Sequence, residues 1–341
     1  MTAGAEPVIN IMAGMSHRKT SVSCFLSIAV VLALLSVEPA EAQKVSLLLD
    51  WGWIPYHTVF LTAEDRGFYR DAGLEVTIEQ GRGSATTAIV VGQGSFDIGH
   101  LNITNAAQAI GKGVPLKVVA IYQHRTAASF IGIKGKVQLK DPQSLKGLKI
   151  GSTPGGSDGL SLTLFSKLNS IPLSDLNIVA LDANTKRVAL LDGTVDVVSG
   201  DSHAFGAIVR GSGREPEFLM LADYGVPLLG FGFAVNETFV EREPQAIKKF
   251  LAATKRGFQA AVENPQAACQ LIQSKVFVGG SREQCVDYFM GLMALSQAPT
   301  DPNWGRQSTE EWEKLVSTLK SVGEIESDKK PADYFTNDFV P

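Results

Sequence analysis

Aromatic and polar side chains are concentrated in one short stretch of this 341-residue chain. Asp50, Trp51, Trp53, Tyr56 and His57 fall within eight positions, directly after an apolar run typical of a strand. Indole and phenol rings offer flat faces for stacking, and the carboxylate and imidazole offer polar contacts. Ligands of open α/β sheets bind beyond the carboxyl ends of the strands, so we expect this loop to contact a ligand. A tryptophan that only fills the core is the alternative.

Further polar residues occupy the starts of expected helices or the ends of expected strands. They are Ser84, Asn102 and Thr104 in the first part of the chain, and Gly156, Ser157, Asp158, Asp201, Ser202 and His203 in the second. Free N–H groups and hydroxyls at helix starts can hold a polar or anionic group. Ordinary helix capping is the alternative for each, with Ser84 expected as one cap and Thr104 or Asn105 as another.

A hydrolase is the enzymatic alternative. Residues 155–159 fit the G-x-S-x-G pattern of a nucleophile elbow, and the order Ser157, an aspartate, His203 matches a catalytic triad. The elbow must join a strand directly to a helix, yet Thr153 and Pro154 separate the serine from the expected strand. We therefore interpret Ser157 as part of a glycine-rich polar cradle and expect no catalytic residue.

Cysteine and histidine spacing gives no metal motif. The histidines after the N-terminal segment are scattered at positions 57, 100, 124 and 203, so neither a metal nor a cofactor is expected. Cys269 and Cys285 lie sixteen residues apart on two expected neighbouring helices. In an oxidising compartment they can form a disulfide, and two buried free thiols remain the alternative.

A repeated phrase indicates how the chain positions these side chains. Residues 88–98 and 188–197 each contain the end of an apolar helix, a glycine and a short strand that opens with aspartate. The repetition predicts two α/β lobes, each a mostly parallel sheet flanked by helices, with a cleft between them for a small molecule. Asp97 and Asp196 are interpreted as markers of strand starts and not as a catalytic pair.

The expected division inserts one lobe into the other. Lobe 1 comprises residues 43–125 and 228–341, and lobe 2 comprises residues 126–227. Two crossings, near His124–Ser129 and Tyr224–Gly230, would form a two-strand hinge, because a few residues at element ends can absorb a closing rotation. The helices after Glu243 are expected to be scaffold on lobe 1.

The N-terminal segment has the pattern of a cleaved signal peptide over residues 1–42. A basic start at residues 17–19 precedes an apolar run and the small-x-small sequence Ala40-Glu41-Ala42; translation from Met1, Met12 or Met15 remains open. The chain has 31 basic and 35 acidic side chains, which gives no support for binding nucleic acid or an anionic membrane. We expect an exported, periplasmic monomer.

The mature chain resembles a known family. The matching stretches are Asp50-Trp51 after a strand, Gly67–Tyr69, Gly73–Val76, Gly94–Gly99, Leu145–Ile150 and Leu191–Asp196. They are similar to periplasmic solute-binding proteins of ABC importers, in the branch that binds thiamine pyrimidine precursors, alkanesulfonates, taurine and nitrate. The resemblance implies a type II periplasmic-binding-protein fold, a solute held by hinge closure, and a membrane permease and an ATPase as partners.

Within that branch, Leu49-Asp50-Trp51 is most similar to the pyrimidine-precursor group, although Gly52-Trp53 is interposed and Tyr56 replaces an asparagine. This similarity implies a flat aromatic or heteroaromatic solute at Trp51, Trp53, Tyr56 and His57. An alkanesulfonate, taurine, nitrate or an aromatic carboxylate are the alternatives, and uptake and sensing both remain open. A related cytosolic branch makes the pyrimidine from histidine and pyridoxal phosphate with iron and a cysteine-rich motif. This chain lacks such a cluster.

Overall fold

The computed structural model describes residue 1 and residues 42–154, 157–276 and 278–341. The expected signal peptide therefore lies almost wholly outside the described residues. Residues 42–341 form one compact unit, and all that follows concerns this unit. In the part of the chain that is described, no helix is both long and apolar enough to cross a membrane.

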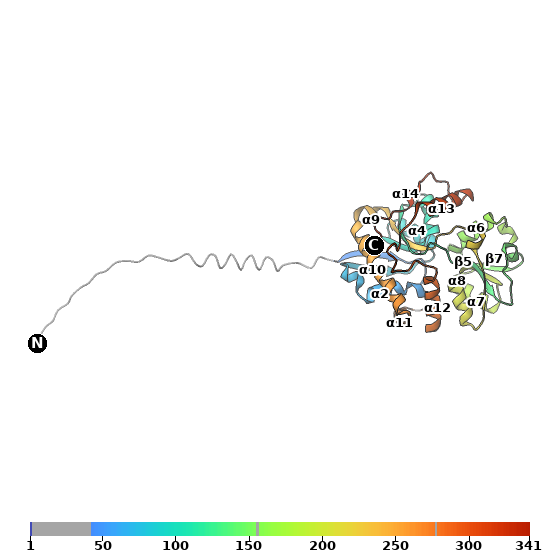
Figure 1. Cartoon of the computed structure of the whole chain (residues 1–341), viewed down its shortest axis with the longest axis horizontal. Coiled ribbons are helices and arrows are strands. Elements are labelled where there is room, and N and C mark those ends of the chain that lie inside the picture. The colour runs from blue at the N-terminus through green and yellow to red at the C-terminus, as the bar shows by residue number, and fades with distance from the viewer. Residues whose placement is uncertain (2–41, 155–156, 277) are drawn as a thin grey trace. The chain divides into compact units, whose positions relative to one another are not determined.

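Two five-stranded sheets form the frame of this unit (Figure 1). The first has the order β2-β1-β3-β10-β4, with β1 Gln43–Leu48, β2 Leu74–Glu79, β3 Ile98–Asn102, β4 Leu116–Ile121 and β10 Phe231–Asn236. The second has the order β7-β6-β8-β5-β9, with β5 Ala128–Ile133, β6 Lys149–Ser152, β7 Asn177–Ala180, β8 Val197–Asp201 and β9 Pro216–Met220. The predicted α/β class with two sheets is confirmed.

Each sheet is mixed, and its one antiparallel strand is the strand that arrives from the other sheet. Strand β5 follows β4 and pairs antiparallel with β8 and β9, while β10 follows β9 and pairs antiparallel with β3 and β4. The remaining four strands of each sheet run in one direction. The expectation of mostly parallel sheets thus holds for strand direction, and the two sheets share one strand order.

The repeated sequence pattern forms the same helix–turn–strand structure in both sheets. Helices α4 Ser84–Gly92 and α7 Ala183–Asp192 are followed by Gly94 and Gly193, whose positive φ angles (78° and 85°) favour glycine. Just before β3, the carboxylate of Asp97 accepts a hydrogen bond from the backbone of Ser46 in β1 (2.8 Å). Just before β8, Asp196 accepts one from the backbone of Lys149 in β6 (2.8 Å). Each aspartate therefore ties its strand to the neighbouring parallel strand of the same sheet.

Helices flank both sheets. Before β10 they are, besides α4 and α7, α2 Thr58–Asp65, α3 Phe68–Asp71, α5 Ile103–Gly111, α6 Ser157–Leu168 and α8 Ser202–Gly211. After β10 they are α9 Glu237–Arg242, α10 Pro244–Glu263, α11 Pro265–Lys275, α12 Arg282–Met293, α13 Thr309–Ser321 and α14 Pro331–Tyr334. Short 3₁₀ turns include Pro55–His57 (η1) and Leu221–Tyr224 (η4).

Helix α10 packs on α2 through the apolar face that its sequence predicts. Ile247, Phe250, Leu251 and Phe258 are buried there. Gly257 permits close approach, because a Cβ atom at this position would lie 2.4 Å from the carbonyl oxygen of Val59. This part of the C-terminal region is scaffold on the first sheet, as expected.

Helix α12 departs from that expectation because it contacts elements of both sheets. It packs on η1 beside the first sheet and on α8, which follows the second sheet (Figure 1). Arg210 of α8 donates two hydrogen bonds to Asp287 of α12 (2.9 and 3.1 Å). A Cβ atom at Gly291 would lie 3.0 Å from the Cβ atom of His203. Helix α12 is therefore a bridge between the two sheets.

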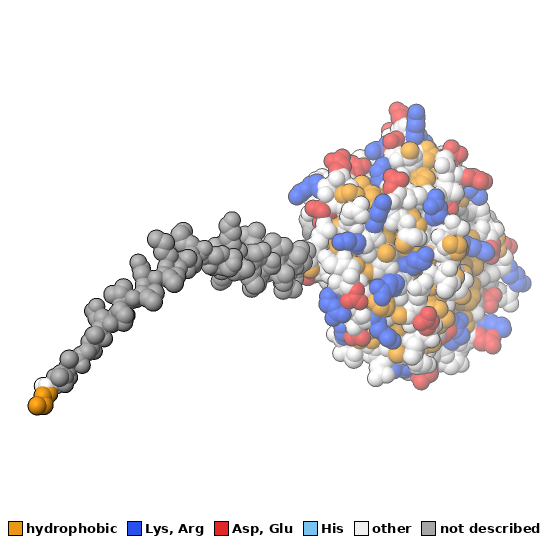
Figure 2. Space-filling model, turned by 60° about the vertical axis from the view of Figure 1, so that its left-hand side comes forward, with side chains coloured by type: hydrophobic (Ala, Val, Ile, Leu, Met, Phe, Trp, Pro, Cys, Tyr) orange, Lys and Arg blue, Asp and Glu red, His pale blue; other side chains and the backbone are white. Residues whose placement is uncertain are grey.

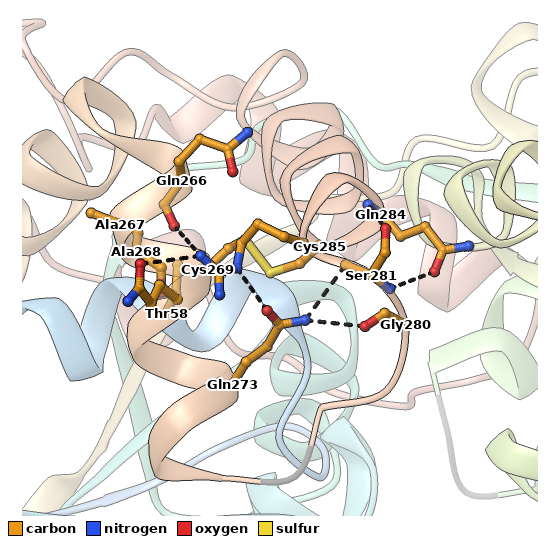
Figure 3. The surroundings of a disulfide bond; sticks show 12 residues. Thr58, Gln266, Ala267, Ala268, Cys269, Gln273, Gly280, Ser281, Gln284 and Cys285 are labelled. Carbon is orange, nitrogen blue, oxygen red and sulfur yellow. Dashed lines mark hydrogen bonds between the residues drawn. A yellow bond between two sulfur atoms is a disulfide. The ribbon is translucent and has the colours of Figure 1, made fainter.

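A disulfide between Cys269 and Cys285 fixes α12 to α11, which settles the alternative left open by the sequence (Figure 3). Both cysteines are buried. Nearby, the hydroxyl of Thr58 in α2 donates a hydrogen bond to the carbonyl oxygen of Ala268 (2.6 Å). The bridging helix is thus anchored covalently to α11 and through α11 to the first sheet's helices.

Candidate ligand-binding site

Asp50, which follows β1, is the centre of a buried hydrogen-bond cluster. Its Oδ1 atom accepts from His57 Nε2 and His100 Nδ1 (both 2.9 Å), and its Oδ2 atom accepts from the Tyr56 hydroxyl (2.6 Å). Burial raises the pKa of Asp50, but the hydrogen bonds from His100 and His57 outweigh burial and hold it well below its usual range. Asp50 is therefore a buried carboxylate whose charge three donors stabilise.

The tautomer of His57 follows from its second partner, and that of His100 from the carboxylate it faces, which can only accept. His57 Nδ1 accepts from the backbone N–H of Ile54 (3.3 Å), so the proton of the neutral ring is on Nε2, facing Asp50. His100 Nδ1 faces Asp50 in the same way, and its Nε2 atom pairs with the hydroxyl of Tyr122 (2.7 Å). Burial lowers the pKa of His57 despite the nearby carboxylate.

Asp50, His57 and His100 also have the composition of a metal site, which the spacing of the sequence did not predict. Their ligand atoms all lie within 4.8 Å of one another. A histidine that binds a metal normally donates its other N–H to an acceptor. His57 instead receives the Ile54 N–H at that nitrogen, so binding a metal would place two donors face to face. The geometry favours the hydrogen-bonded cluster over a metal site.

A second buried cluster lies beside the second sheet. Asp158, in the first turn of α6, accepts from the backbone of Thr153 (2.8 Å) and from Lys186 Nζ (2.9 Å). Lys186 also donates to the carbonyl oxygen of Ser199 (2.9 Å) and lies over the ring of Phe205, 5.1 Å from its centre. This ion pair is buried, and hydrogen bonds satisfy both partners.

Asp201 ends β8, and His203 lies two residues further on, in α8. Burial, Asp50 and Asp158 together raise the pKa of Asp201 to about 7, and Lys186 opposes them only in part. Burial lowers the pKa of His203 to about 3. The His203 side chain is buried, and neither ring nitrogen has a hydrogen-bond partner among the described residues.

His203 also meets the aromatic side chains of the first sheet's elements. Its ring centre lies 5.3 Å from that of Tyr288 in α12 and 6.3 Å from that of Tyr56. Tyr56 and Tyr288 lie 6.1 Å apart. These three rings form an aromatic wall where η1, α8 and α12 come together.

A pocket between the two sheets adjoins this wall through Asp201. Its polar lining comes from the end of β3, from β5, from the start of α6 and from the end of β8: Asn102, Ser129, Ser157, Asp158, Ser161, Ser199 and Asp201. The carboxyl ends of strands from both sheets thus converge on one place, where α/β folds bind ligands. The structure brings four of the predicted site residues into this pocket: Asn102, Ser157, Asp158 and Asp201.

Other predicted site residues have structural roles. The Ser84 hydroxyl accepts from the backbone of Asn102 (3.1 Å), and the Thr104 hydroxyl bonds both backbone groups of Leu229 (3.0 Å each). The cap of α4 is Gly83, and that of α5 is Asn102, whose side chain accepts from Thr104 N. The predicted caps at Ser84 and at Thr104 or Asn105 are therefore wrong, because each helix begins earlier than the prediction.

The two tryptophans are half-buried. Trp53 meets His57 edge-on at 6.0 Å and packs against the apolar cluster that contains the disulfide, which favours a packing role. Trp51 accepts a backbone hydrogen bond from Gly81 (3.0 Å). Ser202 begins α8, and its backbone donates to Ala127 O (2.9 Å). Gly156 lies outside the described residues.

The residues of the site that were not predicted are His100, Tyr122, Lys186 and Tyr288, and the pocket-lining serines Ser129, Ser161 and Ser199. A histidine in the middle of an apolar strand, as at His100, was the one indication that the sequence offered, since such a side chain needs a buried partner. Tyr288 reaches the site only because α12 bridges the sheets.

The geometry gives no support to the hydrolase interpretation. A triad needs a hydrogen bond between Ser157 and His203, yet both His203 nitrogens are unpaired in the described structure. Strand β6 ends at Ser152 and α6 begins at Ser157, so no sharp elbow joins them directly.

Comparison with known proteins identifies the family. The family model described as NMT1/THI5 like matches residues 54–268, which is more than half of the chain. This protein belongs to the NMT1/THI5-like family. One relative is the 4-amino-5-hydroxymethyl-2-methylpyrimidine phosphate synthase of Candida albicans, 25% identical over 239 residues, covering 67% of this chain and 70% of the relative. Another is the riboflavin-binding protein RibY of Chloroflexus aurantiacus, 24% identical over 316 residues, covering 88% and 86%.

Solved structures show the fold of this NMT1/THI5-like protein. The alkanesulfonate-binding protein SsuA of Xanthomonas axonopodis, bound to MOPS, superposes with a TM-score of 0.67 at 13% identity over 87% of this chain and 99% of that chain. The periplasmic nitrate-binding protein NrtA of Synechocystis gives 0.66 at 14% identity over 88% and 87%. The chain therefore has the periplasmic-binding-protein fold, as the resemblance implies.

Proposed function

We propose that this NMT1/THI5-like protein is a non-catalytic, exported solute-binding protein. It binds a small heteroaromatic solute, similar to a thiamine pyrimidine precursor, between its two sheets. The observation that carries the proposal is His203, a buried imidazole beside Tyr56 and Tyr288 whose two nitrogens have no partner among the described residues; it follows by two residues Asp201, which lines the polar pocket. Buried polar groups are nearly always hydrogen-bonded, so unpaired ones at a pocket point to a ligand that supplies the partners.

Binding would be coupled to closure of the two sheets on the solute. A ligand shifts a conformational equilibrium only through contacts that differ between the two states. A solute that touches Tyr56 from the first sheet's side and His203 and Asp201 from the second would favour the closed state. A membrane permease and its ATPase would then receive the closed form.

Synthesis of the pyrimidine is the second candidate, because the fungal relatives carry that activity in their names. That branch uses a cysteine-rich motif, whereas Cys269 and Cys285 are joined to each other here. Incubation with pyridoxal phosphate and ferrous iron tests this candidate. Release of a pyrimidine product would replace the binding proposal.

A thermal-shift panel tests the binding proposal directly. The panel contains 4-amino-5-hydroxymethyl-2-methylpyrimidine, riboflavin, taurine, an alkanesulfonate, nitrate and an aromatic carboxylate. We expect the pyrimidine to raise the unfolding temperature, since a ligand at a hundred times its dissociation constant stabilises the folded state by about 2.7 kcal/mol. A shift with nitrate or a sulfonate alone would contradict the heteroaromatic assignment.

His203 provides a matched pair of variants. His203→Leu removes both nitrogens, and we expect at least a tenfold loss of affinity, about 1.4 kcal/mol. The unliganded variant should be as stable as the wild type or more stable, because an unpaired buried polar group is lost. His203→Gln keeps a donor and an acceptor and should retain part of the binding. Calorimetric titration and chemical unfolding measure both quantities, and equal affinity of all three proteins would show that His203 does not touch the ligand.

A further inference from the structure

The charges around the pocket determine which solutes it can accept. We infer that the site selects a cationic or strongly N–H-donating planar solute and rejects anions, which rests on the binding function proposed above. Three carboxylates surround the site, at Asp50, Asp158 and Asp201, and among the described residues the cation close to them is Lys186. Carboxylates thus outnumber this cation around the site, which favours a ligand that brings positive charge or N–H donors.

Lys186 is not available to an anionic ligand. Its ammonium group already donates to Asp158 Oδ2 and to the carbonyl oxygen of Ser199, both at 2.9 Å, and it lies over the ring of Phe205. The side chain is only 5% exposed. The described residues that line the pocket include no lysine and no arginine, and Lys186 lies behind Asp158 and Ser199 of the lining. A sulfonate or carboxylate would therefore find no free cation among the described residues that line the pocket.

The helix N-termini at the pocket are also unsuited to an anion. The start of a helix attracts negative charge through its free N–H groups. In α6 the protein's own Asp158 carboxylate occupies this region and accepts from the backbone of Thr153 (2.8 Å). In α8 the residue at the N-cap is Asp201. The starts of α6 and α8 thus already have a carboxylate, and at the start of α5 the Asn102 side chain, which also lines the pocket, accepts from Thr104 N (3.1 Å).

The aromatic wall favours the same class of solute. Tyrosine rings attract cations to their faces, and Tyr56 and Tyr288 lie 6.1 Å apart beside Asp201. His203 is a second and independent feature. It is only 5% exposed, and both its nitrogens lack partners among the described residues. A neutral imidazole offers one donor and one acceptor. A planar amidine-like or aminopyrimidine-like group offers N–H donors to Asp201 and to the imidazole acceptor.

Three ligands of nearly equal shape separate charge from shape. Benzamidine is cationic, benzamide is neutral and benzoate is anionic. At pH 8 we expect calorimetric titration to give at least a tenfold higher affinity for benzamidine than for benzamide, and weaker binding still for benzoate. Asp201→Asn should lower the affinity for benzamidine at least tenfold and leave that for benzamide within threefold. Thermal melts of this variant establish that it is folded.

Asp223→Asn is the matched control, because Asp223 is an exposed carboxylate paired with Arg125 (3.1 Å). It should leave all three affinities unchanged. Benzoate binding as tightly as benzamidine, no binding of benzamidine at millimolar concentration, or an Asp201→Asn variant with unchanged preference would each overturn the charge assignment. The binding function would survive any of these results if a solute of the thermal-shift panel still binds, and it would fall if none does.

Discussion

At the scale of single residues, the buried charge on Asp50 has the largest effect on the site. Moving a carboxylate away from water is strongly unfavourable unless donors replace the water. Tyr56, His57 and His100 provide these donors from η1 and β3, and they fix the positions of the rings at the base of the site. The same side chains thus stabilise the fold and shape the ligand's surroundings.

Tyr56→Phe tests this arrangement. It removes the hydroxyl that donates to Asp50 Oδ2 at 2.6 Å, and we expect a loss of about 1.5–3 kcal/mol in the free energy of unfolding, since the acceptor is charged. Tyr69→Phe is the control, because Tyr69 is equally buried but bonds the neutral Thr254 hydroxyl (3.0 Å). That change should cost about 0.5–1.5 kcal/mol by urea unfolding. Equal losses would mean that Asp50 does not depend on Tyr56.

The raised pKa of Asp201 predicts how the stability of the protein depends on pH. Its pKa in the folded protein, about 7, lies above its ordinary value of 3.8, so between these values the folded protein binds more protons than the unfolded chain. Its contribution to stability therefore decreases as pH rises from 4 to 7. Asp201→Asn should gain stability relative to the wild type as pH rises over this window, measured by thermal melts.

The groups that interact with Asp201 are Asp50, Asp158, Lys186, Tyr56, Tyr122 and Tyr288, and His203 lies two residues along the chain. All three tyrosines have a pKa raised well above its usual value by burial and remain neutral over the window. His203 acts in the opposite direction, because stability falls as pH drops from 6.5 towards its folded pKa of about 3. Comparing variant and wild type at each pH removes this contribution. Parallel curves would contradict the prediction.

The predicted site residues show how far single positions could be inferred. Asp50, Tyr56, Asp158, Asp201 and His203 do lie at the two clusters or the pocket. The sharing of Asp50 by His57 and His100 could not be inferred, because 43 positions separate the two histidines and only the sheet brings them together. A polar residue type indicates that a partner exists, but not which one.

At the scale of elements, α12 has the largest effect on the site. It supplies Tyr288 to the aromatic wall and Asp287 to the ion pair with Arg210, and the disulfide holds it on α11. Periodicity predicted helices in this region, but it could not assign α12 to both sheets. Its amphipathic pattern is the same whichever neighbour it covers.

Loss of the disulfide should weaken both fold and binding. The bond closes a loop with a sequence separation of 16, and replacement of both Cys269 and Cys285 by alanine should lower the free energy of unfolding by about 3 kcal/mol. Affinity for the solute should fall as well, because α12 loses its anchor. Chemical unfolding with and without dithiothreitol measures the effect. The double variant should not respond to the reductant, and a wild type that does not respond either would contradict the prediction.

At the scale of the whole molecule, the two sheets are joined where the chain crosses between them. The crossings lie side by side: Gly230 N donates to Gln123 O (2.9 Å), and Gln123 N donates to Phe231 O (3.1 Å). The side chain of Gln123 also accepts from Phe231 N (3.1 Å). The predicted positions of both crossings were close to these residues, because glycine and proline mark the second one in the sequence.

Charged side chains of both signs are interspersed on the face in Figure 2, consistent with the balanced composition.

Gly230→Ala tests how tightly the crossings fit. The new Cβ atom would lie 2.2 Å from Gln123 Oε1, so Gln123 must move and lose its bond to Phe231. We expect a destabilisation of about 1–3 kcal/mol by urea unfolding. Gly159→Ala in α6 is the control, since nothing lies within 4 Å of its Cβ position and helix propensity favours alanine by about 1 kcal/mol. Changes of the same sign in both variants would contradict this account.

The exchange of antiparallel strands has a consequence for the order in which the chain is completed during synthesis. The second sheet is built from one continuous stretch, from Ala128 to Met220. The first sheet needs β10, which ends at Asn236, although its other four strands are finished by Ile121. Synthesis proceeds from the N-terminus. The first sheet can therefore be completed only after all strands of the second sheet have been made. Until β10 arrives, β3 and β4 each have an open edge on which another strand can pair.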